Sequence, residues 1–331
     1  MKRENGIDLF RFIGAFLVVL LHTSGYTVKN YSFMSYVLIF ARWAVPFFFI
    51  TSGYFLGLKI LKSNDVSLRL IDSNIIKLLG AIFISDLIYF PYDAYKRGEF
   101  SYTSKVFLEG TSFHLWFLGS LLFGYIIVWF MYYYKWGKLL PYLSVGIFFI
   151  MIVADSYDTF FGVKLKYEFP RFLSSIPFLY VGIYFSKQKK VQRPIGIHTL
   201  YIILAIIILF IEAHFINQFT GKTNEHQMII FTIVLSVLIF KYCISIDIKE
   251  NVFTRLGKKY SLFIYMYHIL IGTLSFFLFK FMFEDLTWYI YFPLLVFCLT
   301  LGLGILINKY NNRLFLILNG VLRKDHEKTI N

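Results

Sequence analysis

The sequence predicts an all-α, polytopic membrane protein with about ten transmembrane helices in one bundle. Hydrophobic residues make up 58% of the 331 residues and aromatic residues 21%, and the mean hydropathy is +0.65. In a typical soluble domain, about half of the residues are apolar. The apolar residues also fall in long runs, many of them about 20 residues long, which is the length of a helix that crosses a bilayer. Short basic loops separate these runs.

The runs predict ten helices in chain order. The third, fifth and sixth runs are the shortest. In the second run, Pro46 and the Ser52–Gly53 pair allow a kink or a close approach of another helix. The predicted spans are 7–27, 36–58, 74–91, 114–134, 138–155, 171–186, 196–216, 227–245, 260–280 and 288–308.

The loops between the spans carry Lys and Arg unevenly, and this asymmetry predicts the orientation. Cytoplasmic loops of membrane proteins are enriched in Lys and Arg. With the first residue on the cytoplasmic side, the segments on that side hold 22 Lys and Arg, and the external segments hold eight. The other three, Arg11, Arg42 and Arg171, lie within or at the edge of spans. Both termini are therefore predicted to be cytoplasmic.

No polar block of domain size and no Pro/Gly/Ser-rich linker interrupts the chain, so residues 1–331 are predicted to form a single membrane domain. The tail, about 309–331, has an apolar stretch between arginines, which predicts a short interfacial helix. The first span is expected to be no cleaved signal peptide, because it contains Arg11 and no small-residue cleavage site follows it. No internal repeat is evident.

The net charge of +14 is expected to reflect topology and contact with anionic lipid, and no nucleic-acid partner is predicted. The 33 Lys and Arg are scattered through short loops, without a basic face or an RNA-binding motif. Cys243 and Cys298 lie in or beside apolar runs and lack metal-ligand spacing. They are therefore expected to be packing residues.

Two polar residues of the first span have a spacing that predicts a functional path. Arg11 and His22 are eleven residues apart, about 20° past three helical turns, so they share one face and lie about 16 Å apart along it. An arginine in hydrocarbon costs about 2.5 kcal/mol or more, and such residues tend to face the bundle interior. The alternatives are that Arg11 snorkels to the inner surface or pairs with Asp8, and that His22 makes a structural interhelical hydrogen bond.

Four further polar residues are predicted in the external half of the bundle or near its middle: Arg42, His114, Arg171 and His268. An imidazole can take a proton from an attacking hydroxyl and return it. An arginine can hold a phosphate or a developing oxyanion. The alternatives are snorkelling for the two arginines, an interfacial anchor for His114 beside Trp116, and core packing for His268.

The predicted cytoplasmic loop between the second and third spans carries Lys59, Lys62, Arg69 and Lys77. Four cations there could hold the phosphates of an anionic cosubstrate. The alternative is that they only obey the positive-inside rule.

The motifs of familiar soluble enzymes are missing: there is no G-x-S-x-G elbow, no P-loop and no H-E-x-x-H. The glycines of the G-x-G at Gly302 and Gly304 lie in the tenth span, and we expect them to serve helix packing. The remaining histidines have no supporting context and are expected to be structural. They are His198, His214, His226 and His326.

Several of these segments together resemble the acyltransferase-3 family of integral-membrane acyltransferases. The resemblance is carried, in order, by IDLFRFIGAFLVVLLH, RWAVPFFFITSGYF, FHLWFLGSLL, RFLSSIPFLYVGIYF and LGKKYSLFIYMYHILI, over nearly the whole chain. The family's signature is an Arg followed eleven positions later by a His, and Arg11 and His22 match it. Phe12 stands where many relatives have Gly, and the loop between the second and third spans lacks a tight pair of arginines.

The resemblance implies transfer of an acyl group, commonly acetyl, from cytoplasmic acyl-CoA to a hydroxyl of an extracytoplasmic glycan or lipid-linked sugar. His22 and Arg11 then match the family's essential, catalytic residues. Acetyl-CoA is the implied cosubstrate, with Arg69 and Lys77 as its candidate ligands, and no metal is expected. Four residues match recurrent positions and are candidates for binding the acceptor or an oxyanion: Arg42, His114, Arg171 and His268.

A transporter for a small polar solute such as an amino acid is the alternative, because similar membrane domains occur fused to resistance-associated serine racemases. A purely structural role gives no reason to bury three arginines and several histidines. The Phe- and Lys-rich composition with short loops is typical of the bacterial cytoplasmic membrane, so the bilayer is an expected partner. A homo-oligomer is compatible with the sequence.

Overall fold

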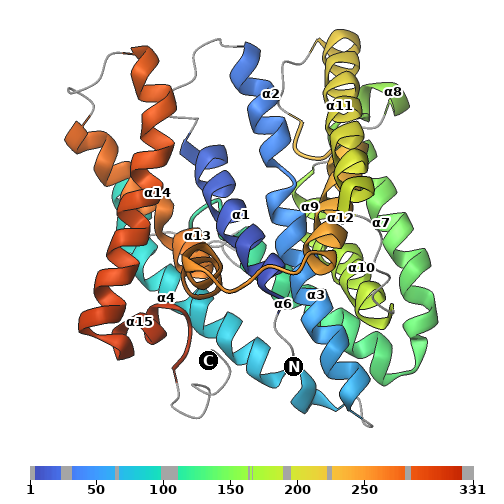
Figure 1. The fold of residues 1–331 in the computed structure, drawn as a ribbon, viewed down its shortest axis with the longest axis horizontal. Coiled ribbons are helices and arrows are strands. Elements are labelled where there is room, and N and C mark those ends of the chain that lie inside the picture. The colour runs from blue at the N-terminus through green and yellow to red at the C-terminus, as the bar shows by residue number, and fades with distance from the viewer. Residues whose placement is uncertain are drawn as a thin grey trace.

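The computed structural model describes residues 4–23, 32–63, 67–97, 111–162, 165, 167–188, 195–221, 226–279 and 285–322. Within these residues all regular elements are helices, as predicted (Figure 1). The helices are α1 (Asn5–Thr23), α2 (Ser32–Ala41), α3 (Ala44–Lys62), η2 (Leu68–Leu70), α4 (Asp72–Arg97), α6 (Trp116–Tyr133), η3 (Trp136–Leu139), α7 (Leu140–Asp155), α8 (Asp158–Phe161), α9 (Glu168–Leu173), α10 (Ser175–Lys187), α11 (Ile195–Thr220), α12 (Ile230–Ser245), α13 (Val252–Phe279), α14 (Asp285–Tyr310) and α15 (Asn312–Leu318).

Eight segments of the described chain are long and apolar enough to cross a membrane, which makes this a multi-pass membrane protein. They lie on α1, α2 with α3, α4, α6, η3 with α7, α11, α13 and α14. The other two predicted spans are shorter helices, α12 with 16 residues and α10 with 13. The sixth span is divided because Pro177 has no N–H to donate to the carbonyl of Leu173, where α9 ends.

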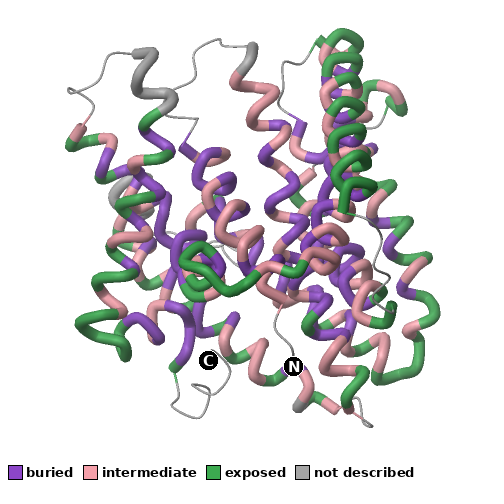
Figure 2. The backbone as a smooth tube through the Cα atoms, viewed as in Figure 1, coloured by how far each residue is buried: buried purple, intermediate pink, exposed green. Residues whose placement is uncertain are grey.

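Helix α1 lies in the middle of the bundle, with α13 and α14 on one side of it and α3 and α12 on the other (Figure 1). Its most extensive contact is with α13. In the apolar stretches of α1 and α13, 56% of the residues are buried, whereas in that of α11 only 22% are buried. Figure 2 shows this contrast between the purple stretches of α1 and the largely green α11. Helix α1 is therefore surrounded by protein to a greater extent than α11.

Glycines allow the closest helix contacts. A Cβ at Gly53 of α3 would meet the backbone of Leu179, and a Cβ at Gly182 of α10 would meet the carbonyl of Ile50. The close helix approach predicted for Gly53 is thus confirmed. Of the two glycines in the tenth span, Gly304 faces the ring of Phe263, whereas a Cβ at Gly302 would meet nothing. The predicted packing role therefore holds for Gly304 and is wrong for Gly302.

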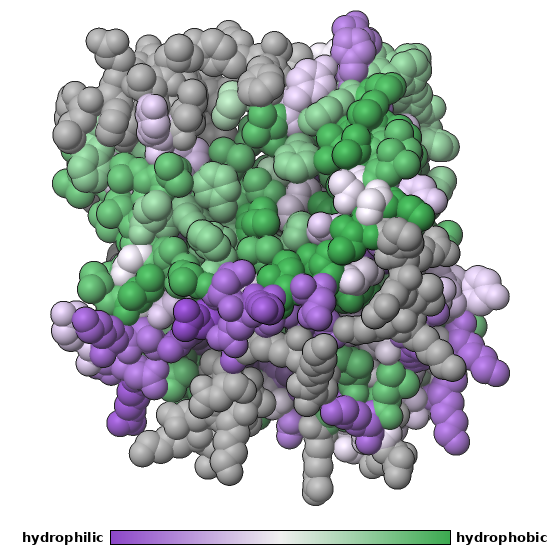
Figure 3. Space-filling model, viewed as in Figure 1, coloured by the Kyte–Doolittle hydropathy of each residue, from purple (hydrophilic) through white to green (hydrophobic). Residues whose placement is uncertain are grey.

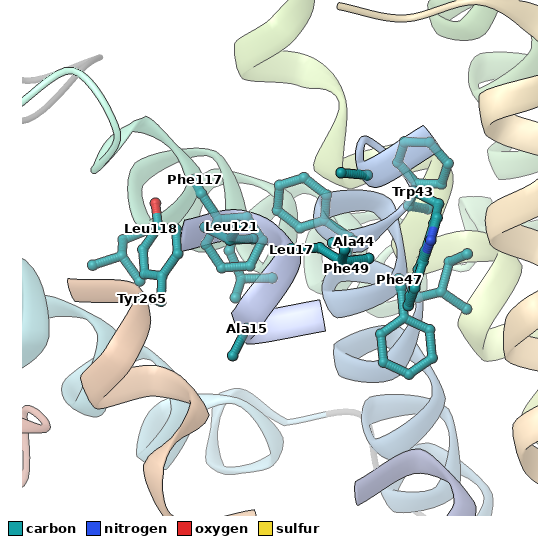
Figure 4. Close-up of a cluster of buried hydrophobic side chains, with 14 of the residues drawn as sticks. Ala15, Leu17, Trp43, Ala44, Phe47, Phe49, Phe117, Leu118, Leu121 and Tyr265 are labelled. Carbon is teal, nitrogen blue, oxygen red and sulfur yellow. The ribbon is translucent and has the colours of Figure 1, made fainter. Parts of the chain in front are cut away.

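The core at the level of α1 is built largely from aromatic side chains. The rings of Phe49 and Phe117 stack with centroids 4.4 Å apart, and Tyr265 of α13 lies 5.1 Å from Phe117. Figure 4 shows these side chains in one cluster with Ala15 and Leu17 of α1. Four helices that are distant in sequence, α1, α3, α6 and α13, meet in this layer.

Hydrophilic residues gather toward one side of the molecule, at the bottom of Figure 3, below a broad apolar surface. The beginning of α1 and helix α15 both lie toward this side (Figure 1). The predicted tail helix is present as α15. The hydroxyl of Tyr267 on α13 donates to the carbonyl of Leu318 at 2.8 Å and so links α15 to the bundle. Which side faces the cytoplasm stays a prediction from the Lys and Arg distribution.

The two cysteines differ. Cys243 is buried, and its carbonyl lies against Gly6 of α1. Cys298 is exposed on α14, so the packing role predicted for it is wrong. Helix α14 presents much apolar surface to its surroundings, and a small apolar residue fits there without a protein partner.

Candidate functional site

Three histidines from three separate parts of the chain meet beside the end of α1. Ring centroids are 5.3 Å apart for His22 and His268, 5.2 Å for His114 and His268, and 6.1 Å for His22 and His114. His22 lies one residue before the end of α1, His114 in the turn before α6, and His268 within α13. His114 and His268 are fully buried, whereas His22 is partly exposed. We refer to these three residues as the histidine cluster.

Hydrogen bonds fix the ring of His114. Its Nε2 lies 3.1 Å from the carbonyl oxygen of Met266 and therefore donates a proton to it. Its Nδ1, 3.0 Å from the hydroxyl of Ser112, then accepts in the neutral ring. The hydroxyl of Tyr265 donates to the backbone carbonyl of His114. Both nitrogens of His114 are thus engaged by the protein.

The ring of His268 is held from one edge only. Its Nδ1 lies 3.0 Å from the carbonyl oxygen of Ile264 and 2.8 Å from that of Tyr265, so Nδ1 carries the proton. Its Nε2 is buried and has no hydrogen-bond partner among the described residues. Because an unpaired polar atom in a protein interior is costly, such an atom suggests a place for a substrate group. The core-packing interpretation of His268 leaves this nitrogen unexplained.

Tyr89 of α4 forms hydrogen bonds with α13 beside the histidine cluster. Its hydroxyl donates to the carbonyl of Met266 at 2.8 Å and accepts from the N–H of Leu270 at 3.2 Å. These are the two groups that an α-helix pairs with each other, so the hydroxyl is inserted into the helical ladder. Tyr89 is one tyrosine among 25 in an apolar chain, so nothing in the sequence distinguishes it as a site residue.

Arg42 and Arg171 both line a cavity of about 60 Å³. Each arginine lies at a helix break: Arg42 is in the turn between α2 and α3, and Arg171 is near the end of α9. Pro46 supplies the first break, because it has no N–H to bond to the carbonyl of Arg42. The guanidinium of Arg171 lies 5.0 Å from the ring centroid of Trp116. We call this cavity the arginine pocket.

The lining of the arginine pocket is mixed, with polar groups set among apolar ones. It comprises Leu21, Arg42, Val45, Pro46, Phe49, Trp116, Tyr167, Arg171, Ser174, Phe178, Gln227 and Met228. Leu21, which lines the pocket, directly precedes His22 on α1, so the pocket lies near the histidine cluster. The charges of Arg42 and Arg171 also act on His22.

Two residues of this region were not predicted from the sequence. Asp155, at the end of α7, interacts electrostatically with Arg42. Its Oδ2 accepts from the backbone N–H groups of Gln227 and Met228 at 2.7 and 2.6 Å. Burial, together with the Asp155 carboxylate, raises the pKa of Tyr167, so its hydroxyl remains a proton donor at neutral pH. Neither residue stands out in sequence, because each lies outside an apolar span or at its end.

Arg11 lies toward the opposite end of α1. Its Nη1 is 3.6 Å from Oδ1 of Asp8, and the side chain is 26% exposed. The predicted pairing with Asp8 is thus present. The charge of Arg11 also acts on Lys77 of α4, which places two cations close together. The side chain of Arg69, the other candidate ligand for a cosubstrate, lies outside the described residues.

The face of α1 between Arg11 and His22 points into the bundle. Ala15 and Val18 lie on this face, four and seven residues after Arg11, and are 1% and 0% exposed. The prediction that both polar residues share an inward face is therefore consistent with the fold. The same burial means that Arg11 and His22 are separated by packed side chains, and a molecule passing between them must part these.

Two histidines outside the cluster have hydrogen-bond partners in the protein, and His198 is buried on α11. The hydroxyl of Tyr36 lies 3.1 Å from Nδ1 of His214, and Nε2 of His226 lies 3.1 Å from the amide oxygen of Asn217. His326 lies outside the described residues. In the described part of the chain, no group of three or more His, Cys, Asp or Glu side chains has the arrangement of a metal site.

The arrangement places titratable imidazoles next to a pocket with two guanidinium groups. Imidazoles can move a proton on and off a hydroxyl, and guanidinium groups can bind an anion or steady an oxyanion. These are the requirements of acyl transfer to a hydroxyl. They are also compatible with binding a small charged solute.

Comparison with known proteins bears on this choice. The profile of a protein family described as an acyltransferase domain, acyltransferase-3, matches residues 4–309. The chain is 26% identical over 75% of its length to an amino-acid racemase of Enterococcus faecalis, and the match covers 39% of that protein. It is 24% identical over 71% of its length to a serine/alanine racemase of Enterococcus gallinarum, covering 36% of it. The chain thus spans about two fifths of these relatives. No solved structure matches it.

Proposed function

The chain belongs to the acyltransferase-3 family, and from this premise we propose that it is a membrane O-acetyltransferase. It would move an acetyl group from cytoplasmic acetyl-CoA to a hydroxyl of an extracytoplasmic cell-surface glycan or lipid-linked sugar. The observation that carries the proposal is the histidine cluster beside the arginine pocket. The bacterial cytoplasmic membrane is the proposed location.

His22 is the proposed catalytic base. It is the only member of the histidine cluster that is partly exposed, and it lies next to the arginine pocket. A ring nitrogen takes the proton of the acceptor hydroxyl as the oxygen attacks the thioester carbonyl. The tetrahedral intermediate collapses, the C–S bond breaks, and the proton returns from the imidazolium to the departing thiolate of CoA. An acetyl group carried briefly on His22 itself is the other route, with the same net reaction.

The neighbouring residues have supporting roles in this scheme. His268 offers its unpaired Nε2 to the reacting groups, and His114 holds the carbonyl of Met266 and so positions α13. Arg42 and Arg171 bind the acceptor or the developing oxyanion. Fixed donors in a site that excludes water stabilise charge more strongly than donors in solution.

The donor is proposed to bind at the other end of α1. Arg11 and Lys77, whose charges interact, would hold phosphates of acetyl-CoA, with Arg69 as a further candidate. Asp8 balances one of these two positive charges, and a phosphate of the ligand would balance the other. The pantetheine arm would then extend along the face of α1 that carries Ala15 and Val18, which requires α1 and its neighbours to move apart.

The proposal is tested by mass spectrometry of cell-surface glycans from cells with and without the gene. We expect O-acetyl groups that depend on the gene and that disappear in His22→Ala. His214→Ala is the matched control, because this histidine also lies in a span but outside the histidine cluster, and it should leave the acetyl groups in place. Unchanged O-acylation of every surface glycan on loss of the gene would refute the proposal.

Transport of an amino acid is the second candidate, favoured by the relatives that are named amino-acid racemases. In this case the arginine pocket would bind the carboxylate of the solute. Uptake of labelled L-serine by proteoliposomes separates the two candidates. Uptake that is lost in Arg171→Gln, together with absent acetyl transfer, would favour transport.

A further inference from the structure

The arginine pocket has a charge balance that limits what it can bind. Arg42 and Arg171 contribute two positive charges, and Asp155 contributes one negative charge beside Arg42. Tyr167 stays neutral because burial and Asp155 oppose its ionisation. One positive charge is left without a partner among these groups. Such a charge in a protein interior favours an anion of one unit.

The donors of the pocket are also incompletely used. Nε of Arg42 is buried and has no hydrogen-bond partner among the described residues. The guanidinium carbon of Arg171 lies over the ring of Trp116, 5.0 Å from its centroid, and a cation–π contact does not use the N–H donors of the guanidinium in hydrogen bonds. Guanidinium edges match the paired oxygens of a carboxylate or a phosphate.

The size of the pocket restricts the ligand further. A cavity of about 60 Å³ has room for a few waters or for a group of similar bulk. A carboxylate or a phosphodiester group fits, whereas a whole sugar ring does not. The pocket is therefore suited to one charged substituent of a larger molecule whose remainder lies outside it.

We propose that the arginine pocket binds a compact, singly charged anion, a carboxylate or a phosphodiester, carried by the acceptor of the acyl group. This inference rests on the proposed function, because it takes the ligand to be the acceptor of the acyl group. The anion site itself can be tested without any acyl donor. The anion anchors the acceptor, and a hydroxyl elsewhere on the same molecule then reaches His22. Neutral glycans would lack this anchor. Asp155 is a positioning residue that sets the charge of the pocket.

The test measures binding to the purified full chain in nanodiscs, without acetyl-CoA. The probes are sodium glucuronate for a carboxylate, dimethyl phosphate for a phosphodiester, and glucose as the neutral match. Binding is followed by fluorescence, since Trp116 lines the pocket, and by the rise in melting temperature that a ligand of the folded state produces. We expect saturable binding of glucuronate, dimethyl phosphate or both, and none of glucose. The anion that binds more tightly shows whether the pocket selects a carboxylate or a phosphodiester.

Arg42→Gln and Arg171→Gln should each weaken anion binding at least tenfold. Arg255→Gln is the matched control, because Arg255 is 65% exposed and far along the chain from the pocket, at an ion pair with Glu250; its binding should equal that of the wild type. Equal binding of glucose, absence of saturable anion binding, or unchanged affinity in both pocket variants would overturn the inference.

Asp155→Asn gives a second, independent readout. It keeps a carbonyl oxygen for the backbone N–H groups of Gln227 and Met228 but removes the negative charge. The pocket then favours a doubly charged ion, so the affinity for inorganic phosphate at pH 8.5 should rise about tenfold relative to that for glucuronate. An unchanged ratio of the affinities for phosphate and glucuronate in a folded variant would contradict the assignment of one net positive charge to the pocket. If anion binding is present but no acetyl transfer is found, the anion site stands and the proposed enzymatic function fails.

Discussion

The carbonyl oxygen of Met266 is the residue-scale feature on which the histidine cluster depends. It accepts from Nε2 of His114 and from the hydroxyl of Tyr89. These two donors come from α4 and from the turn before α6, so one backbone atom ties three parts of the chain together. His268, two residues later, takes its position from this junction.

Replacing His268 separates its structural role from a chemical one. In His268→Asn, the amide nitrogen can still donate to the carbonyls of Ile264 and Tyr265, as Nδ1 does now. In His268→Gln, a polar atom replaces Nε2 instead. We expect His268→Asn to fold but to lose acetyl transfer by about 100-fold or more, the usual contribution of a proton-transferring group. Full activity of the Asn variant, measured with labelled acetyl-CoA, would make His268 a packing residue.

Tyr89→Phe removes the hydroxyl that bridges Met266 and Leu270. A neutral hydrogen bond contributes about 1 kcal/mol to stability, so the melting temperature should fall slightly. We expect kcat to fall by a larger factor than KM changes. The reason is that the carbonyl of Met266, which accepts from the ring of His114, is no longer held by Tyr89. Tyr142→Phe, on a 77% exposed tyrosine, is the control. Equal kcat values for the two variants would show that Tyr89 is not a positioning residue.

At the residue scale, the sequence was sufficient where periodicity carries the information. The spacing of Arg11 and His22 predicts a shared face, and Ala15 and Val18 on that face are buried, which is consistent with an inward orientation. The sequence was insufficient for Tyr89, Asp155 and Tyr167, because these residues act through tertiary contacts that no local pattern encodes.

At the scale of elements, helix breaks and glycine contacts place the site. Most of the ten predicted spans correspond to helices that could cross a membrane, because long apolar runs are the clearest signal in a sequence. The lengths of α10 and α12 were harder to predict, since a run of apolar residues does not show where its helix is interrupted. The break before α10 nevertheless positions Arg171, and the break before α3 positions Arg42.

The contact between α3 and α10 gives a test at this scale. Gly53→Ala would drive a Cβ into the backbone of Leu179, and overpacking of this kind costs about 1–3 kcal/mol. We expect a lower melting temperature in detergent and weaker anion binding, because Phe49 of α3 and Phe178 of α10 both line the arginine pocket. Gly302→Ala, where a Cβ meets nothing, should be neutral or stabilising. A Gly53→Ala protein as stable as the wild type would show that the helices can separate at little cost.

At the scale of the whole molecule, the fold separates two charged regions by a packed aromatic layer. Arg11 and Lys77 lie toward one side, and the histidine cluster with the arginine pocket lies toward the other. The stacked rings of Phe49 and Phe117 belong to this aromatic layer (Figure 4), and Phe49 also lines the arginine pocket. A protein that passes only a small acyl group needs no permanent wide channel, so a closed resting state agrees with the proposed reaction.

The most direct measurement uses inverted membrane vesicles, which expose the cytoplasmic face. Membrane-impermeant labelled acetyl-CoA is supplied outside, and the membrane's own glycans face the lumen. The account predicts that alkali-labile acetyl label accumulates on lumenal glycans with the wild-type protein and not with His22→Ala. Equal accumulation with His22→Ala, or labelling only when the donor is placed on the lumenal side, would contradict it.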